Sequence, residues 1–239
     1  MSTAAGTLVD QTVVVHAGIL DYQEAWQLQR DTVEAIIAGT TPNTLFLLQH
    51  PSVYTAGRMT KPEDRPLDGT PVIDVDRGGK ITWHGLGQIV GYPIVKLKNR
   101  SDVVGFVREV ESALIEVCIE FGIPAERYCE RSGVWIRDEK GDRKIAAIGM
   151  RVAKGVTMHG FALNVLESSM QPFRSITPCG IAGVQMTSLE RETGRRLDFQ
   201  TVSDQAGELF MSMCGAPFSS CCQLQMAVLP QWKKRGHVL

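Results

Sequence analysis

Apolar and polar positions alternate along the 239-residue chain with two different periods, which separates helix-like from strand-like segments. The second of three predicted helices begins at Ser101 or Asp102. Its apolar residues recur every three or four positions, so one face is expected to be buried. The first helix begins at Asp21, which matches a capping box with Glu24, and Gly39 ends it. The predicted helices cover residues 21–39, 101–122 and 199–214.

Apolar runs of strand length lie before and between these helices: Thr12–His16, Thr44–Gln49, Val72–Val75, Ile89–Val95, Gly133–Arg137, Ile145–Val152 and Val156–Val165. The last three runs, the first two joined by a turn at residues 139–142, are typical of an antiparallel meander. Helices that interrupt such strands predict the α+β class, with a mixed, largely antiparallel central sheet and helices packed on it. Residues 52–70 are rich in Pro, Gly and charged residues, and we expect them to form a long functional loop.

Composition indicates a soluble globular protein with a single domain over residues 1–239, whose ends, about 1–8 and 219–239, are expected to be flexible. The formal net charge of -1 gives no general attraction to nucleic acid or to a membrane surface. No apolar run reaches the length of a membrane span, and the first residues lack a secretory pattern. We therefore expect a cytoplasmic protein without nucleic-acid or membrane partners, and a monomer as the default state.

The six cysteines form neither a disulfide framework nor a zinc pattern. The chain is far larger than the secreted domains that depend on disulfides, and it has no C-x-x-C pair. Cys118 lies on the apolar face of the second predicted helix and is expected to be a core residue. Packing roles are also expected for Cys129, Cys214, Cys221 and Cys222.

Cys179 differs from the other cysteines because Pro178 and Gly180 place it on a bend. To react as a nucleophile its thiol needs a nearby cation, since an unassisted thiol has a pKa of about 8.5. The residues alone do not decide between a Cys–His and a Cys–Lys pair. Each partner also has a structural explanation, as a satisfied buried histidine or a solvated lysine at a strand end. The candidate partners are Lys144, His84 and His159.

The segment Arg77-Gly78-Gly79-Lys80-Ile81-Thr82-Trp83-His84-Gly85-Leu86-Gly87-Gln88 contains four glycines, an arginine and a histidine. A glycine cluster indicates that the backbone bends sharply or approaches a ligand closely. The flanking Arg77 and His84 favour a ligand that is polar at one end. Alternatively, Arg77 holds the loop through backbone carbonyls and the glycines serve turns alone.

Four motifs in this order resemble the lipoyl (octanoyl) transferases, and the resemblance extends from about Tyr22 to Glu190. Trp83 stands where the family usually has Tyr, and Leu86 where it usually has Pro, which puts the shape of the loop in question. The motifs are Arg77-Gly78-Gly79-x-x-Thr82-x-His84-Gly85-x-Gly87-Gln88-x-Val90-Gly91-Tyr92-Pro93, Lys144-Ile145-Ala146-Ala147-Ile148-Gly149, Thr157-x-His159-Gly160-x-Ala162-Leu163-Asn164 and Pro178-Cys179-Gly180-Ile181.

The resemblance implies a fold like that of biotin and lipoate ligases, with a mixed sheet and packed helices. It implies transfer of an octanoyl group from acyl carrier protein to a lysine of lipoyl domains, through a thioester on Cys179 with Lys144 beside it. Neither ATP nor a metal would be required. The acceptors would be the E2 subunits of 2-oxoacid dehydrogenases and the H protein of glycine cleavage. The implied substrate-binding residues are Arg77, Gly78, Gly79, Lys80, Ile81, Thr82, Trp83, His84, Ala147, Ile148, Gly149, Gly160, Phe161 and Ala162, with His50, Tyr92 and His159 as further candidates.

Three other functions remain open at this point. They are an ATP-dependent lipoate or biotin ligase in which Cys179 is incidental, a non-catalytic module that binds acyl groups or lipoyl domains, and a Cys–His protease. Acyl carrier proteins and lipoyl domains tend to be acidic, so a basic rim would favour encounter. The candidate rim residues, which are otherwise a solvated surface, are Arg58, Lys61, Arg65, Lys96, Lys98 and Arg100.

Overall fold

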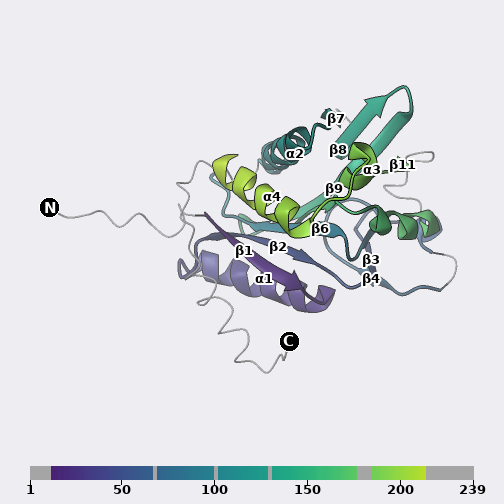
Figure 1. Ribbon diagram of the computed structural model, residues 1–239. Helices are drawn as coiled ribbons and strands as arrows, with labels where there is room; N and C mark the ends of the chain where they lie inside the picture. Colours follow the sequence, from purple (N-terminus) through teal and green to yellow (C-terminus); the bar gives the residue numbers. More distant parts are fainter. Residues whose placement is uncertain (1–11, 67–68, 100–101, 129–130, 177–184, 214–239) are drawn as a thin grey trace.

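The computed structural model describes residues 12–66, 69–99, 102–128, 131–176 and 185–213, which fold around one large sheet (Figure 1). Its strands are β1 Thr12–Ile19, β2 Asn43–Gln49, β6 Gln88–Ile94, β7 Ala125–Tyr128, β8 Arg131–Asp138, β9 Gly141–Ala153, β10 Val156–Asn164 and β11 Gln185–Met186. Their order is β1-β2-β6-β10-β9-β8-β7, with β11 on β9. The β1–β2 and β9–β11 pairs are parallel and the others antiparallel, which confirms the predicted mixed sheet and its meander.

A smaller sheet of three strands corrects the prediction that residues 52–70 are a long loop. β3 Val53–Ala56 lies between β4 Val72–Asp74 and β5 Thr82–His84, and a 3-10 helix, η2 Pro62–Asp64, lies in the same region. β3 is only four residues long, and its partners come later in the chain. A run this short carries too little period-two signal to be recognised before its partners are known.

Helices cover both faces of the large sheet (Figure 1). α1 Tyr22–Ile37 lies on one face, and α2 Val103–Glu120 and α4 Phe199–Met213 lie on the other. All three confirm the predicted helices, and Asp21 caps α1 by accepting hydrogen bonds from two backbone N–H groups. Besides η2, two further helical elements were not predicted: η3 Glu167–Ser175 and α3 Leu189–Thr193. None of the helices in these ranges is long and apolar enough to cross a membrane.

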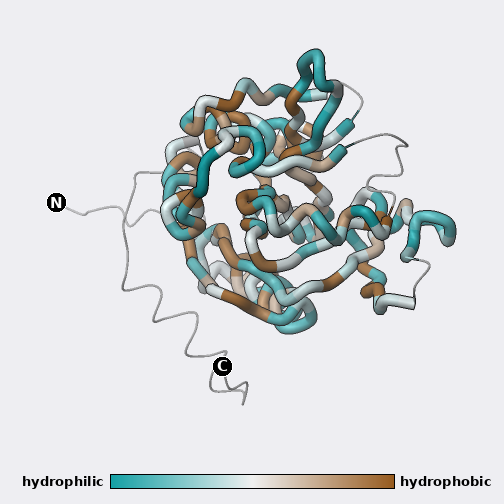
Figure 2. The backbone as a smooth tube through the Cα atoms, turned by 45° about the vertical axis from the view of Figure 1, so that its right-hand side comes forward, coloured by the Kyte–Doolittle hydropathy of each residue, from teal (hydrophilic) through white to brown (hydrophobic). Residues whose placement is uncertain are grey.

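The two sides of the sheet have separate hydrophobic cores because successive strand residues point to opposite faces. On β2, Leu45 and Leu47 belong to the core under α2 and α4, whereas Phe46 and Leu48 belong to the core under α1. Figure 2 shows the hydrophilic tip of the β8–β9 hairpin projecting from the sheet.

One of the six cysteines lies within the described part of the chain. Cys118 on α2 is fully buried, as predicted for a core residue, and burial raises the pKa of its thiol to about 12. The predictions for the remaining five fall outside the described residues: Cys129, Cys179, Cys214, Cys221 and Cys222.

Candidate active site

A cavity lies where the small sheet meets the large one, beside the first residue of α1. Strands β9 and β10 form its floor, and the loop that follows β4 forms one wall. The fold thus brings together three motifs that are far apart in the sequence. The residues that line the cavity are Tyr22, Arg77, Gly79, Lys80, Thr82, His84, Tyr92, Ala147, Ile148, Gly149, His159, Gly160, Phe161 and Ala162.

The glycine loop packs directly on β9. The Gly78 N–H donates to the Met150 carbonyl at 3.0 Å, and a Cβ atom on Gly149 would lie 2.9 Å from the Gly78 oxygen. The buried Arg77 guanidinium donates to the carbonyl oxygens of Thr55 and Lys80, at 2.8 Å each. Arg77 therefore holds the loop through backbone carbonyls and also lines the cavity.

The alternation of side chains along β5 divides the expected binding residues into two groups. Thr82 and His84 face the cavity, whereas Ile81 and Trp83 belong to a third hydrophobic cluster with η3. Trp83 donates its indole N–H to the Ser52 hydroxyl at 2.9 Å. Gly78, Ile81 and Trp83 are thus not part of the cavity lining, and the Trp83 departure from the family pattern acts on packing behind β5. Leu86, the other departure, is exposed.

Behind the cavity, His50 is fully buried and supports Tyr92. Because a carbonyl can only accept, Nδ1 of His50 donates to the Leu20 oxygen at 2.7 Å, so Nε2 accepts from the Tyr92 hydroxyl at 2.7 Å. Burial lowers the pKa of His50 to about 4, so the ring is neutral. Tyr22 stacks on His84 with ring centroids 6.0 Å apart, and burial raises its pKa to about 12.

His159 has a positive φ of 57° and an almost fully buried ring. Its Nε2 lies 2.7 Å from a carboxylate oxygen of Asp76, which also forms an ion pair with Arg151. Burial, reinforced by the neighbouring charges of Arg77, Arg151 and Arg30, lowers the pKa of His159 to about 3. The cavity wall therefore presents neutral histidines and protonated tyrosines beside the cationic Arg77.

Lys144 lies on β9, on the same strand as Ala147–Gly149 but outside the cavity lining. Its side chain is almost fully buried, and Nζ lies 5.0 Å from the centroid of the Trp135 ring. Gly133 on β8 leaves room for it: a Cβ atom there would lie 2.5 Å from Cε of Lys144. Gly133 has a φ of +116° and donates its N–H to the buried Glu111 carboxylate at 3.0 Å.

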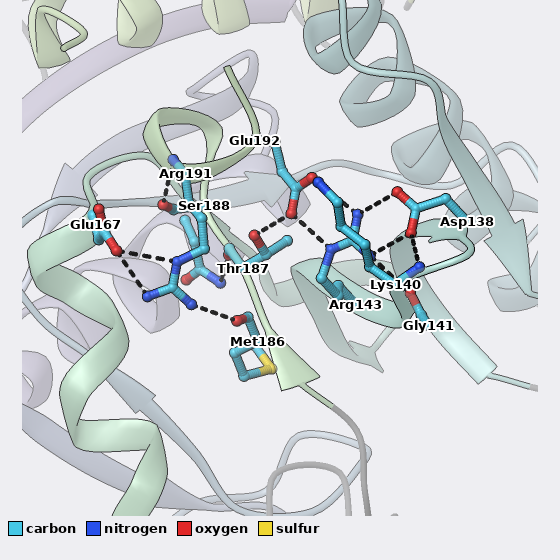
Figure 3. Close-up of polar contacts among 11 residues, drawn as sticks. Asp138, Lys140, Gly141, Arg143, Glu167, Met186, Thr187, Ser188, Arg191 and Glu192 are labelled. Carbon is cyan, nitrogen blue, oxygen red and sulfur yellow. Dashed lines mark hydrogen bonds and ion pairs between the residues drawn. The ribbon is translucent and has the colours of Figure 1, made fainter. Parts of the chain in front are cut away.

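A group of ion pairs and hydrogen bonds connects β11 and α3 to the β8–β9 hairpin (Figure 3). Arg143 forms two hydrogen bonds to each of Asp138 and Glu192, at 2.7 to 3.0 Å. Glu192 also accepts from the Thr187 hydroxyl at 2.5 Å, and the Thr187 N–H donates to the Lys144 carbonyl at 2.9 Å. We call Asp138, Arg143, Thr187 and Glu192 the Arg143 clamp.

Cys179 lies in the segment between η3 and β11, outside the described residues. The first described residues after it are in β11, where Met186 is paired with Lys144. The prediction that Cys179 and Lys144 are neighbours is therefore untested.

The predicted basic rim is partly neutralised by carboxylates. Lys61 lies 3.7 Å from Glu63, and Arg65 forms an ion pair with Asp74. Arg58, Lys96 and Lys98 are exposed, and Arg100 lies outside the described residues. Where side chains are described, no group of three His, Cys, Asp or Glu residues has the arrangement of a metal site.

Three residues of the site were missed from the sequence. Tyr22 follows the N-cap of α1 and has no motif to mark it. The Thr55 carbonyl accepts a hydrogen bond from the Arg77 guanidinium, and the Thr187 N–H, next to β11, donates to the Lys144 carbonyl. Both lie in short strands or beside them, so a signal appears only once the sheets are assembled.

The model of the lipoyl protein ligase A/B catalytic domain matches residues 21–211. The chain therefore belongs to this family.

Relatives in two bacteria are similar over most of the chain. An octanoyltransferase of Mycolicibacterium smegmatis is 55% identical over 201 residues, which are 83% of this chain and 86% of that protein. An octanoyltransferase of Salinispora tropica is 54% identical over 200 residues, covering 83% of this chain and 92% of that protein.

Solved structures with little sequence identity share the fold. A bipartite lipoate protein ligase, studied with its E2 lipoyl domain from Thermoplasma acidophilum, gives a TM-score of 0.65 at 13% identity, covering 94% of this chain and 92% of that chain. Lipoate-protein ligase A bound with ATP gives a TM-score of 0.63 at 12% identity, covering 94% of both chains. These likenesses extend to the fold alone and confirm the predicted lipoate-ligase-like architecture.

Proposed function

We propose that the chain is an octanoyltransferase that moves an octanoyl group from acyl carrier protein to a lysine of lipoyl domains. The identity of 55% with an octanoyltransferase over 83% of the chain carries this proposal. The cavity supports it, because neutral rings and close-packed glycines line a space for an acyl chain beside two basic side chains, Arg77 and Lys80. We infer that the acceptors are E2 subunits and the glycine-cleavage H protein.

In the first half-reaction, the Cys179 thiolate attacks the carbonyl carbon of the octanoyl thioester. The bond from that carbon to the pantetheine sulfur breaks, and the Lys144 ammonium gives the departing sulfur a proton. The products are an octanoyl thioester on Cys179 and a neutral Lys144 amine. The burial of Lys144 against Trp135 supports this role, because a buried ammonium is stabilised most by an adjacent anion.

In the second half-reaction, a neutral lysine of the lipoyl domain attacks the Cys179 thioester. The carbon–sulfur bond breaks, an amide forms, and the attacking nitrogen gives one proton to Lys144. The thiolate and the ammonium are thereby restored. Conversion of a thioester to an amide is downhill, so no nucleotide is needed to drive the reaction, and none of the proposed steps uses a metal.

Transfer without ATP distinguishes this function from that of a ligase that shares the fold. We expect octanoyl carrier protein and an E2 lipoyl domain to give the octanoylated domain in buffer treated to remove nucleotides. Mass spectrometry of the domain measures the product. Product that forms only after addition of ATP, with free octanoate as donor, would show that the chain is a ligase.

Lys144→Ala is expected to slow both half-reactions by about 100-fold or more, because the group that gives and takes the proton is lost. Rapid-quench measurement of enzyme acylation and of transfer to the domain follows each step separately. Lys140→Ala, at the exposed tip of the same hairpin, is the matched control and should transfer at the wild-type rate. Wild-type rates for Lys144→Ala would remove its proposed role.

A further inference from the structure

A line of buried polar side chains connects the cavity to β11. Nδ1 of His84 lies 2.8 Å from Oε1 of Gln88 at the start of β6. Nε2 of Gln88 donates to Oδ1 of Asn164 at 2.9 Å, and Nδ2 of Asn164 donates to the Thr187 carbonyl at 3.0 Å. Gln88 and Asn164 are each 1% exposed. We call these four residues the amide relay.

The direction of every hydrogen bond in the relay follows from its far end. The Thr187 carbonyl can only accept, so Asn164 must present its amino group there and its oxygen to Gln88. Gln88 must then donate to Asn164, which leaves its own oxygen facing His84. Nδ1 of His84 must therefore carry the proton. The tautomer of His84 thus follows from the hydrogen-bond network, which is fixed by the Thr187 carbonyl.

The His84 ring holds no second proton. Burial, together with His50 and Arg77, lowers the pKa of His84 well below its ordinary value. With Nδ1 protonated and the ring neutral, Nε2 has a lone pair. His84 lines the cavity, so this lone pair belongs to a wall residue of the substrate site.

We propose that Gln88 and Asn164 are positioning residues that hold His84 as the Nδ1–H tautomer, so that Nε2 accepts a hydrogen bond from an N–H group of the bound substrate. This inference rests on the proposed transfer to an amine, since both the pantetheine arm and the acceptor lysine carry N–H donors. A ring with the opposite tautomer would present a donor and oppose such a substrate.

The relay also reaches the strand of Lys144. Thr187 accepts from Asn164 through its carbonyl, and its N–H donates to the Lys144 carbonyl at 2.9 Å. The position of β11 on β9 and the tautomer of His84 therefore both depend on the backbone of Thr187. Figure 3 shows the Thr187 hydroxyl bonded to Glu192, which in turn accepts hydrogen bonds from Arg143.

NMR of the ring nitrogens of the full-length, histidine-labelled protein tests the tautomer directly, with His84→Asn used to assign the resonances. The expected spectrum has a protonated Nδ1 and an unprotonated Nε2 for residue 84. Gln88→Met keeps the length of the side chain but removes both amide groups, and Asn164→Leu removes the next link. Each should populate the Nε2–H tautomer of His84 and lower kcat/KM by about tenfold or more through misplacement of the substrate.

Thr32→Val is the matched control, because it removes a buried hydrogen bond to the Leu28 carbonyl in α1, away from the relay. It should leave the His84 resonances and the rate unchanged. A wild-type His84 with its proton on Nε2 would overturn the proposal. So would Gln88→Met and Asn164→Leu proteins that fold, keep the Nδ1–H tautomer and transfer at the wild-type rate. The NMR result does not depend on activity, so a wild-type chain that transfers no octanoyl group would refute the proposed function separately.

Discussion

The side chain of Lys144 packs directly against the backbone of Gly133. The Gly133 φ of +116° is strained for any residue with a Cβ atom, and that atom would lie 2.5 Å from both Cε of Lys144 and the Ala146 carbonyl. A single methyl group added at this position therefore has to displace the lysine, the strand, or both.

Gly133→Ala is expected to lower kcat/KM by about 10- to 100-fold, because a shift of the reacting amine by about 1 Å misplaces the proton transfer. Gly141→Ala is the matched control: its φ of +95° imposes similar backbone strain, but nothing lies within 4 Å of the added atom. Both variants should lose stability in urea unfolding, by about 1–3 kcal/mol. Equal losses of activity in the two proteins would contradict the steric role of Gly133.

His50 makes stability depend on pH in a defined direction. Its pKa is about 4 in the folded protein, below the ordinary value of 6.5, so the unfolded state binds more protons between these values. The contribution of neutral His50 to the free energy of unfolding is therefore complete above pH 6.5. It is lost as the pH falls toward 4, by about 1.4 kcal/mol per pH unit.

His50→Asn retains a donor for the Leu20 carbonyl but does not titrate. Urea unfolding from pH 8 to pH 4.5 is expected to show a shallower loss of stability for His50→Asn, by about 1.4 kcal/mol per pH unit below pH 6.5. Above pH 7 the difference between the two proteins should be constant, which is the internal control. Parallel curves over the whole range would mean that His50 titrates normally.

The sequence predicted the residues of the cavity where they lie in dense motifs. Arg77 and His84 were identified because they flank a cluster of glycines, and Gly149 was identified through the family resemblance. Thr187 could not be identified, because its role depends on a backbone carbonyl and N–H that every residue has. Tyr22 looked like an ordinary first residue of a helix.

At the scale of elements, the Arg143 clamp stabilises β11, a strand too short to be stable through its own pairing. β11 has two residues, and such a pair has little stability of its own. Arg143, with 7% of its side chain exposed, joins Asp138 of the hairpin to Glu192 of α3. The hydrogen bonds that Arg143 donates to these carboxylates raise its pKa, so the charge persists at every pH of interest.

Arg143→Met is expected to release β11 from β9, because it leaves two carboxylates without their partner. Hydrogen exchange of the Thr187 amide, which donates to Lys144, should become at least about 100-fold faster, equivalent to about 3 kcal/mol. Arg137→Met, which removes exposed ion pairs from the same hairpin, should change the free energy of opening at the Thr187 amide by less than about 1 kcal/mol. Unchanged exchange in Arg143→Met would show that β11 is held by other contacts.

The elements that could be predicted are those whose signal is local. α1 and α2 have N-caps, glycine stops and a continuous apolar face, and the long strands have runs of apolar residues. β3, β5 and β11 have two to four residues each, and they form by pairing with strands that are distant in the sequence. Their hydrogen bonds are non-local, so sequence periodicity alone does not indicate them.

At the scale of the molecule, two sheets meet so that three motifs surround one cavity. The same fold occurs in a ligase that binds ATP, at 12% identity, so the architecture does not determine the chemistry. We propose that the difference lies in whether a cysteine thiolate and a buried lysine perform the acyl transfer. The central claim is therefore covalent catalysis at Cys179.

Intact-mass analysis after incubation with octanoyl carrier protein, in the absence of a lipoyl domain, tests this claim most directly. We expect a gain of one octanoyl group that peptide mapping assigns to Cys179, that is absent in Cys179→Ser, and that disappears when a lipoyl domain is added. A wild-type protein that transfers octanoyl groups to the domain without any acylated cysteine would contradict the account.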